Sequence, residues 1–194
     1  MIRYPEYNNS YIVNLVAIDP GSTKLGFAVL SVDVRSNTIV QSIAKTYITD
    51  KMVPEDDMLV KTHGERCDRI LAQSNNLYSE FMYHHPSVIA YESPFYNPRT
   101  PMAYGALMQV LMAIKASAIK YNPLINFVQF APREIKKCIC VDDKGVDKDT
   151  IRRHVLARND LNYVGDVPLH KLGPDAIDAL AIGLTMVANL DNRW

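Results

Sequence analysis

Four acidic residues, far apart in the chain, occupy positions where an ionised side chain is hard to accommodate. Asp19 and Glu92 each directly follow a short apolar run. Asp175 and Asp178 are three residues apart and share one face of a predicted helix whose other residues are largely Ala, Ile and Leu. Removing several like charges from water is costly unless a cation joins them. Four hard oxygen donors favour Mg²⁺ or Mn²⁺ over zinc. Two such ions, about 4 Å apart, can support phosphodiester hydrolysis.

Each acid also has a simpler interpretation. Asp19 precedes Pro20-Gly21 and could cap a turn. Glu92 could reach solvent from a strand end, and Asp175 could favour the positive end of its helix. Asp178 fits a solvated position less well, because it lies inside an apolar stretch. The four together favour a shared site.

The elements that would position these acids follow from periodicity and from Gly and Pro breaks. Short runs rich in β-branched residues predict strands, and apolar residues recurring every three to four positions predict helices. Strands are expected at about 12–19, 26–32, 38–48, 88–91 and 125–130, and helices at about 57–83, 101–120, from 132, at 147–158 and from 174. Three strands with short links form an antiparallel meander, and the later alternation of helix and strand adds a mixed sheet. We therefore expect an α/β fold with a mixed five-stranded sheet and helices on both faces.

Length and composition suit one domain. The chain has 194 residues, of which 48% are hydrophobic and 22% charged. We expect a loose arm at 1–10 and a single domain at 11–190. No apolar run approaches the roughly 20 residues of a membrane span and no hydrophobic signal segment is visible, so we expect no membrane partner and a cytoplasmic setting. The 21 basic and 21 acidic residues balance, so any nucleic-acid contact needs local basic patches.

The acids lie in motifs that resemble those of the RuvC family of Holliday junction resolvases. The motifs are DPGS at 19–22 followed by Gly26, YESPF at 91–95, and GPDAIDALAI at 173–182, and the resemblance covers about residues 12–188. It implies an RNase H-like fold, a homodimer, and paired cleavage of four-way DNA junctions with two Mg²⁺ or Mn²⁺ ions per subunit. It also implies that Asp19, Glu92, Asp175 and Asp178 are the catalytic, metal-binding carboxylates. For a member encoded by a phage, the setting would be the host cytoplasm.

Further residues are candidates for DNA contact. Phe95 falls where the family carries an aromatic residue that stacks on bases, and Tyr96 and Arg99 share its Pro-rich loop. Basic residues downstream match a stretch that the family places near the scissile phosphate, where a cation can stabilise developing charge. They are Arg133, Lys136, Lys137, Lys148 and Arg152, with Lys136 and Lys148 expected to be catalytic. A solvated helix face is the simpler interpretation.

Other classes of protein are compatible with parts of the same sequence. The first motif also resembles the phosphate loop of sugar kinases and actin-like ATPases, but those need two such domains. A nuclease of the RNase H fold that acts on RNA or on hybrids, a non-catalytic binder of branched DNA, and a broader nuclease for flaps and forks are the alternatives. The three cysteines lack zinc-ligand spacing, which favours reduced bystanders.

Overall fold

The computed structural model describes residues 11–52, 58–94, 98–99, 101–140 and 147–190. The strands are β1 (Ile12–Asp19), β2 (Lys24–Asp33), β3 (Thr38–Ile48), β4 (Val88–Glu92) and β5 (Asn126–Phe130). The helices are α1 (Met58–His63), α2 (Glu65–His84), α3 (Pro101–Tyr121), α4 (Pro132–Ile139), α5 (Lys148–Leu156) and α6 (Pro174–Ala188), with short 3₁₀ turns at Thr49–Met52 and Leu169–Lys171.

The five strands form one sheet in the order β3-β2-β1-β4-β5. β1, β2 and β3 pair antiparallel, whereas β4 pairs parallel with both β1 and β5. The predicted mixed sheet with an antiparallel meander is therefore confirmed. Because β1 and β4 run in the same direction, their carboxyl ends meet at one edge of the sheet.

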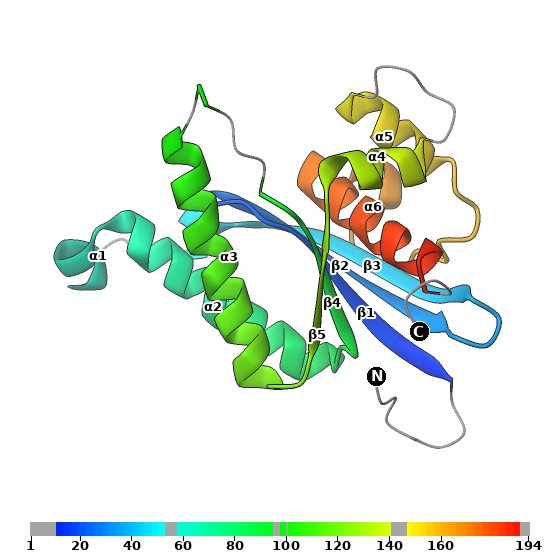
Figure 1. The fold of residues 1–194 in the computed structure, drawn as a ribbon, viewed down its shortest axis with the longest axis horizontal. Coiled ribbons are helices and arrows are strands. Elements are labelled where there is room, and N and C mark those ends of the chain that lie inside the picture. Colours follow the sequence, from blue (N-terminus) through cyan, green and yellow to red (C-terminus); the bar gives the residue numbers. More distant parts are fainter. Residues whose placement is uncertain (1–10, 53–57, 95–97, 100, 141–146, 191–194) are drawn as a thin grey trace.

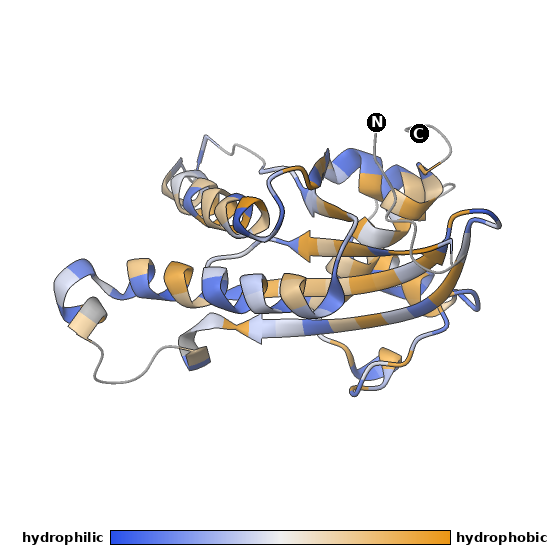
Figure 2. Ribbon diagram, turned by 90° about the horizontal axis from the view of Figure 1, so that it is seen from below, coloured by the Kyte–Doolittle hydropathy of each residue, from blue (hydrophilic) through white to orange (hydrophobic). Residues whose placement is uncertain are grey.

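Helices cover both faces of the sheet, as predicted (Figure 1). Alternate residues of the central strands divide between two cores. Leu15, Ala17 and Leu30 pack with α4, α5 and α6, whereas Val16 and Ile18 pack with α2 and α3. The inner strands are predominantly hydrophobic, while α2 alternates between hydrophilic and hydrophobic segments (Figure 2). Burial on both faces explains why β1 and β4 read as continuous apolar runs.

Helix α6 is the most deeply buried helix of this fold, and a glycine permits its close approach. A Cβ on Gly183 would lie 2.4 Å from Cδ1 of Leu30 and 3.3 Å from Cβ of Ala17. The helix therefore lies directly on β1 and β2, which the absence of a side chain at Gly183 allows.

Helix α3 is apolar nearly all round, as expected, but it is only partly covered. Val110, Leu111 and Ile114 are buried, whereas Met102, Met112 and Ile119 are 76%, 62% and 54% exposed. Within the described ranges it is the one helix long and apolar enough to cross a membrane by length and composition alone. By length and mean hydropathy, α3 therefore departs from the expectation that no apolar run approaches the length of a membrane span. A helix that packs on a protein core can have the same length and hydropathy.

The structure corrects one predicted helix and does not describe the predicted N-terminal arm. The helix expected over 57–83 is divided into α1 and α2, because Gly64 has a φ of 82° that a continuous helix does not allow. The described part of the predicted domain forms one sheet with two cores. The arm at 1–10 lies outside the described residues.

Candidate active site

The ends of β1 and β4 bring the first two acids together. Ile18 pairs with Tyr91 in the parallel ladder, so the next residues, Asp19 and Glu92, lie side by side as the last residues of β1 and β4. The turn after Asp19 is tied to helix α2, because Nε2 of Gln73 donates a hydrogen bond of 2.7 Å to the carbonyl oxygen of Gly21. The sheet and this bond together fix the position of Asp19.

The first turn of α6 brings the other two acids to the same edge. Asp19 pairs with Gly26 across the antiparallel ladder. A Cβ on Gly26 would lie 2.0 Å from the carbonyl oxygen of Asp175. Only glycine leaves room for the helix to begin here. Pro174 occupies the first turn of α6, where its missing N–H costs nothing, and Asp178 follows one turn later.

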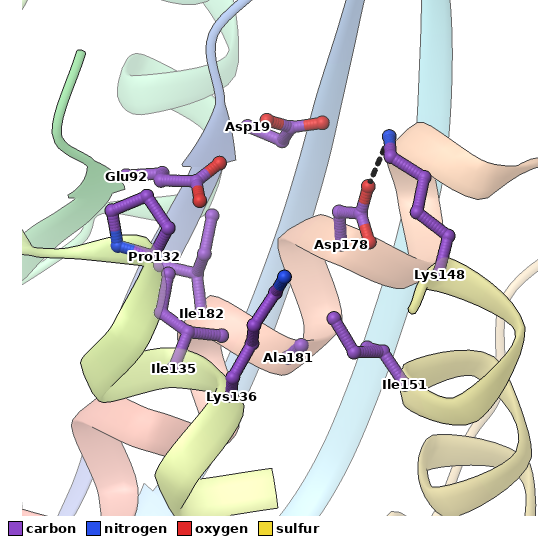
Figure 3. Close-up of a pocket in the computed structure, with 10 residues that line it drawn as sticks. All are labelled: Asp19, Glu92, Pro132, Ile135, Lys136, Lys148, Ile151, Asp178, Ala181 and Ile182. Carbon is purple, nitrogen blue, oxygen red and sulfur yellow. Dashed lines mark hydrogen bonds and ion pairs between the residues drawn. The ribbon is translucent and has the colours of Figure 1, made fainter. Parts of the chain in front are cut away.

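Helices α4 and α5 close the site from the other side. A cavity of about 210 Å³ lies between them, the sheet edge and α6 (Figure 3). Three of the predicted carboxylates, Asp19, Glu92 and Asp178, and both predicted catalytic lysines, Lys136 and Lys148, line it. The cavity thus combines an acidic centre with two cations on its rim.

The carboxylates are close enough to affect one another. Burial, with the charges of Asp178, Glu92 and Asp175, raises the pKa of Asp19 to about 8, although Lys148 opposes the shift. Burial and Asp178 also raise the pKa of Glu92, against the attraction of Lys148 and Lys136. Asp175 does not line the cavity, but it contributes to the negative potential there. The two lysines therefore do not fully compensate the negative charge of these acids.

One ion pair links the acidic centre to α5. Nζ of Lys148 lies 3.0 Å from Oδ2 of Asp178, where the side chains are 72% and 17% exposed. The hydrogen bond to Asp178 raises the pKa of Lys148, with further contributions from the charges of Asp19 and Asp175. Figure 3 shows the two side chains directed toward each other from α5 and α6.

The donor chemistry suits a hard divalent cation, although the side chains are not gathered around one. Carboxylate oxygens are the ligands that Mg²⁺ and Mn²⁺ prefer, and the unbalanced negative charge would be relieved by either ion. In the part of the chain that the structure describes, no three His, Cys, Asp or Glu side chains stand close enough to hold an ion as they lie. The residue types fit the predicted ions, and the carboxylates would need to turn toward them.

Comparison with solved structures gives the fold. RuvC from Thermus thermophilus in complex with a Holliday junction substrate superposes with a TM-score of 0.64 at 17% identity, covering 93% of this chain and 96% of that one. A second T. thermophilus RuvC structure has a TM-score of 0.64 at 18% identity, covering 92% of this chain and 96% of that one. The yeast mitochondrial Holliday junction resolvase has a TM-score of 0.57 at 15% identity, covering 98% of this chain and 86% of that one. The chain has the RuvC fold. No protein-family model and no curated protein matches the sequence.

The remaining predicted DNA-contact residues have different surroundings in this RuvC fold. Arg133 and Lys137 are exposed on α4, and Arg99 is exposed in the turn before α3. The guanidinium of Arg152 donates to the carbonyl oxygens of Leu172 and His170, both at 2.7 Å, so it holds the turn before α6. Phe95 and Tyr96 lie outside the described residues, and their stacking role stays a prediction.

Sequence reasoning missed the apolar floor of the cavity. Pro132 and Ile135 from α4, Ile151 from α5, and Ala181 and Ile182 from α6 line it beside the acids. Ile135 and Ile151 are also core residues, and helical periodicity marks both as buried. That signal does not say that the buried face of each helix borders the acidic centre.

Proposed function

We propose that this protein is a divalent-metal-dependent endodeoxyribonuclease that resolves four-way DNA junctions. The observation that carries the proposal is the convergence of Asp19, Glu92 and Asp178 with two lysines in one cavity, at the edge where β1 and β4 end. The similarity to RuvC bound to a Holliday junction substrate supports the choice of substrate.

The proposed chemistry divides between the acidic centre and its basic rim. Asp19, Glu92, Asp178 and Asp175 would hold two Mg²⁺ or Mn²⁺ ions, which when bound supply an activated water and stabilise the leaving oxygen. The protein keeps these acids partly buried, so their attraction for a cation is little screened by water. Lys136 and Lys148 would hold the phosphate and stabilise the negative charge that develops on it. We infer products with 5′-phosphate and 3′-hydroxyl ends.

We also propose a homodimer, because a four-way junction needs two opposed cuts. The exposed apolar side of α3 suits the contact between subunits, since buried interface cores are apolar. Met112 lies on this side and is 62% exposed. Replacing it by Asp is expected to convert a dimer into a monomer in sedimentation experiments. The replacement of Val164 by Asp serves as the control, because Val164 is an exposed apolar residue outside α3 and the change in charge is the same. Equal masses for M112D and the wild type would argue against this interface.

A synthetic four-way junction with separately labelled arms tests the activity. We expect symmetric paired cuts that require Mg²⁺ or Mn²⁺ and that stop when Asp178→Asn removes one carboxylate, while junction binding survives. Flap, fork, linear duplex and RNA–DNA hybrid substrates, run in parallel, separate a junction resolvase from a broader branched-DNA nuclease and from an enzyme acting on hybrids. Full activity of D178N would reject the site.

A further inference from the structure

The ammonium of Lys148 lies among the carboxylates that we assign to the metal ions. Its Nζ is 3.0 Å from Oδ2 of Asp178. Its charge also acts on Asp19 and Glu92, where it opposes the rise in the pKa of both. Lys148 therefore compensates part of the negative charge of all three acids, whereas Lys136 acts on Glu92.

We propose that Lys148 is an internal counter-ion that a divalent cation must displace from Asp178. This inference rests on the proposed function, because it concerns how the same carboxylates exchange one cation for another. In the metal-free protein, Lys148 holds the carboxylate of Asp178. When a divalent ion binds, Asp178 turns toward Asp19 and Glu92, and Lys148 releases it. The pairing accounts for the observation that three acids converge without being gathered around a common point.

The two partners differ in how readily they can leave the pair. The Lys148 side chain is 72% exposed, so its ammonium can regain water when the contact breaks, whereas Asp178 is only 17% exposed. An uncompensated carboxylate at Asp178 would be costly, but a released lysine would not. The exchange therefore proceeds by departure of the lysine and arrival of another cation.

On α5, the exchange requires movement of the Lys148 side chain but not of the backbone. The N-terminus of α5 is capped by Asp147, whose side chain accepts a hydrogen bond of 2.8 Å from the backbone N–H of Thr150. One turn later Ile151 is 6% exposed and packs in the core. The backbone at Lys148 is thus fixed from both sides. The released ammonium remains at the rim of the cavity, within reach of a phosphate of the bound DNA.

Lys136 provides the matched comparison. It lines the same cavity from α4, and its charge acts on Glu92. Removing either lysine makes the cavity more negative, so a general electrostatic effect would strengthen metal binding in both variants. Only removal of Lys148 also removes the cation that competes for Asp178.

The test is calorimetric titration of Mn²⁺ into the metal-free, DNA-free protein at constant pH and ionic strength. We expect Lys148→Met to bind Mn²⁺ about five-fold more tightly than the wild type, which is the size of a partly exposed ion pair. Lys136→Met should change the affinity by less than half as much on the logarithmic scale. The metal-free melting temperature of K148M should fall below that of the wild type, and saturating Mn²⁺ should close the gap.

The outcomes separate this inference from the proposed function. Equal Mn²⁺ affinity for K148M and the wild type, or equal tightening in K148M and K136M, would overturn the role of Lys148 and leave the nuclease site standing. Failure of the wild type to bind Mn²⁺ would overturn both. A structure with bound Mn²⁺ gives an independent reading, because displacement requires the 3.0 Å contact between Lys148 and Asp178 to be broken.

Discussion

Replacing Asp19 by Asn should abolish cleavage and yet make the metal-free protein more stable. The reason is the environment of this carboxyl. Burial, followed by the charges of Asp178, Glu92 and Asp175, raises the pKa of Asp19 to about 8 from 3.8. A carboxyl whose pKa is higher in the folded chain than in the unfolded chain destabilises the fold once the unfolded form ionises. The penalty is absent below pH 3.8, grows with pH, and is constant above about pH 8.

The size of this penalty sets the expected stabilisation. Each pKa unit corresponds to about 1.4 kcal/mol, so the shift costs at most about 4 kcal/mol at pH 7. The amide of Asn must itself be accommodated among carboxylates, and we expect a net gain in the free energy of unfolding of about 2 kcal/mol. For a domain of this size that corresponds to about 4–8 °C in melting temperature.

Thermal unfolding in EDTA at pH 7 and at pH 4 measures the effect. D19N should melt above the wild type at pH 7 but slightly below it at pH 4, because the cost of the amide remains when the ionisation penalty has nearly gone. Exposed Asp166→Asn removes a charge elsewhere and should change neither value by more than about 1 °C. Saturating Mg²⁺ should then raise the melting temperature of the wild type more than that of D19N, because binding to the folded state stabilises it. A lower melting temperature for D19N at pH 7 in EDTA would refute the reasoning.

Three further changes test other parts of the structure. Burial alone would raise the pKa of Glu80, but hydrogen bonds from His84, Lys45 and Tyr47 lower it to about 2. In denaturant titrations at pH 7, E80Q should therefore have a free energy of unfolding about 2–3 kcal/mol below that of the wild type. The wild type should lose the same amount as the pH falls from 4.5 to 2. G26A should lose about 3 kcal/mol of its free energy of unfolding, together with its cleavage activity, because the added Cβ would meet the backbone of α6. G105A is the control: its Cβ would enter open space on α3, so this variant should be at least as stable as the wild type. K137A should reduce the slope of log K against log salt concentration for junction binding by about one unit. R152A should instead lower the melting temperature, because the guanidinium of Arg152 donates hydrogen bonds to backbone carbonyls.

The acids could be located from the sequence because their positions depend on local patterns. Asp19 and Glu92 follow buried strands, and strand ends mark an edge of a sheet. The convergence of Asp178 with them depends on α6 lying against β1 and β2, which the apolar face of that helix indicates. The antiparallel meander of the first three strands and the mixed character of the sheet followed from the same patterns and from the length of the connections.

The contacts between neighbouring helices could not be derived in this way. Periodicity marks Ile135 and Ile151 as buried, but it does not place them beside a carboxylate. The bonds from Arg152 to backbone carbonyls depend on the path of the loop before α6, and a charged helix face gives no sign of them. Gly64 was compatible with a continuous helix at modest cost, and only its observed φ of 82° shows the break.

The zero net charge of the chain hides a separation of charge that suits the proposed reaction. Basic residues on α4 and α5, namely Arg133, Lys136, Lys137, Lys148 and Arg153, are exposed, whereas the acids they surround are partly buried. An exposed cation is available to a phosphate backbone, and a partly buried group of carboxylates attracts a compact divalent ion that can enter the cavity. In the proposed reaction, each kind of charge would therefore meet a different ligand, although the two lie within one site. DNA brought to the rim adds negative charge beside the acids, which strengthens their attraction for divalent ions, so substrate and metal should each favour binding of the other.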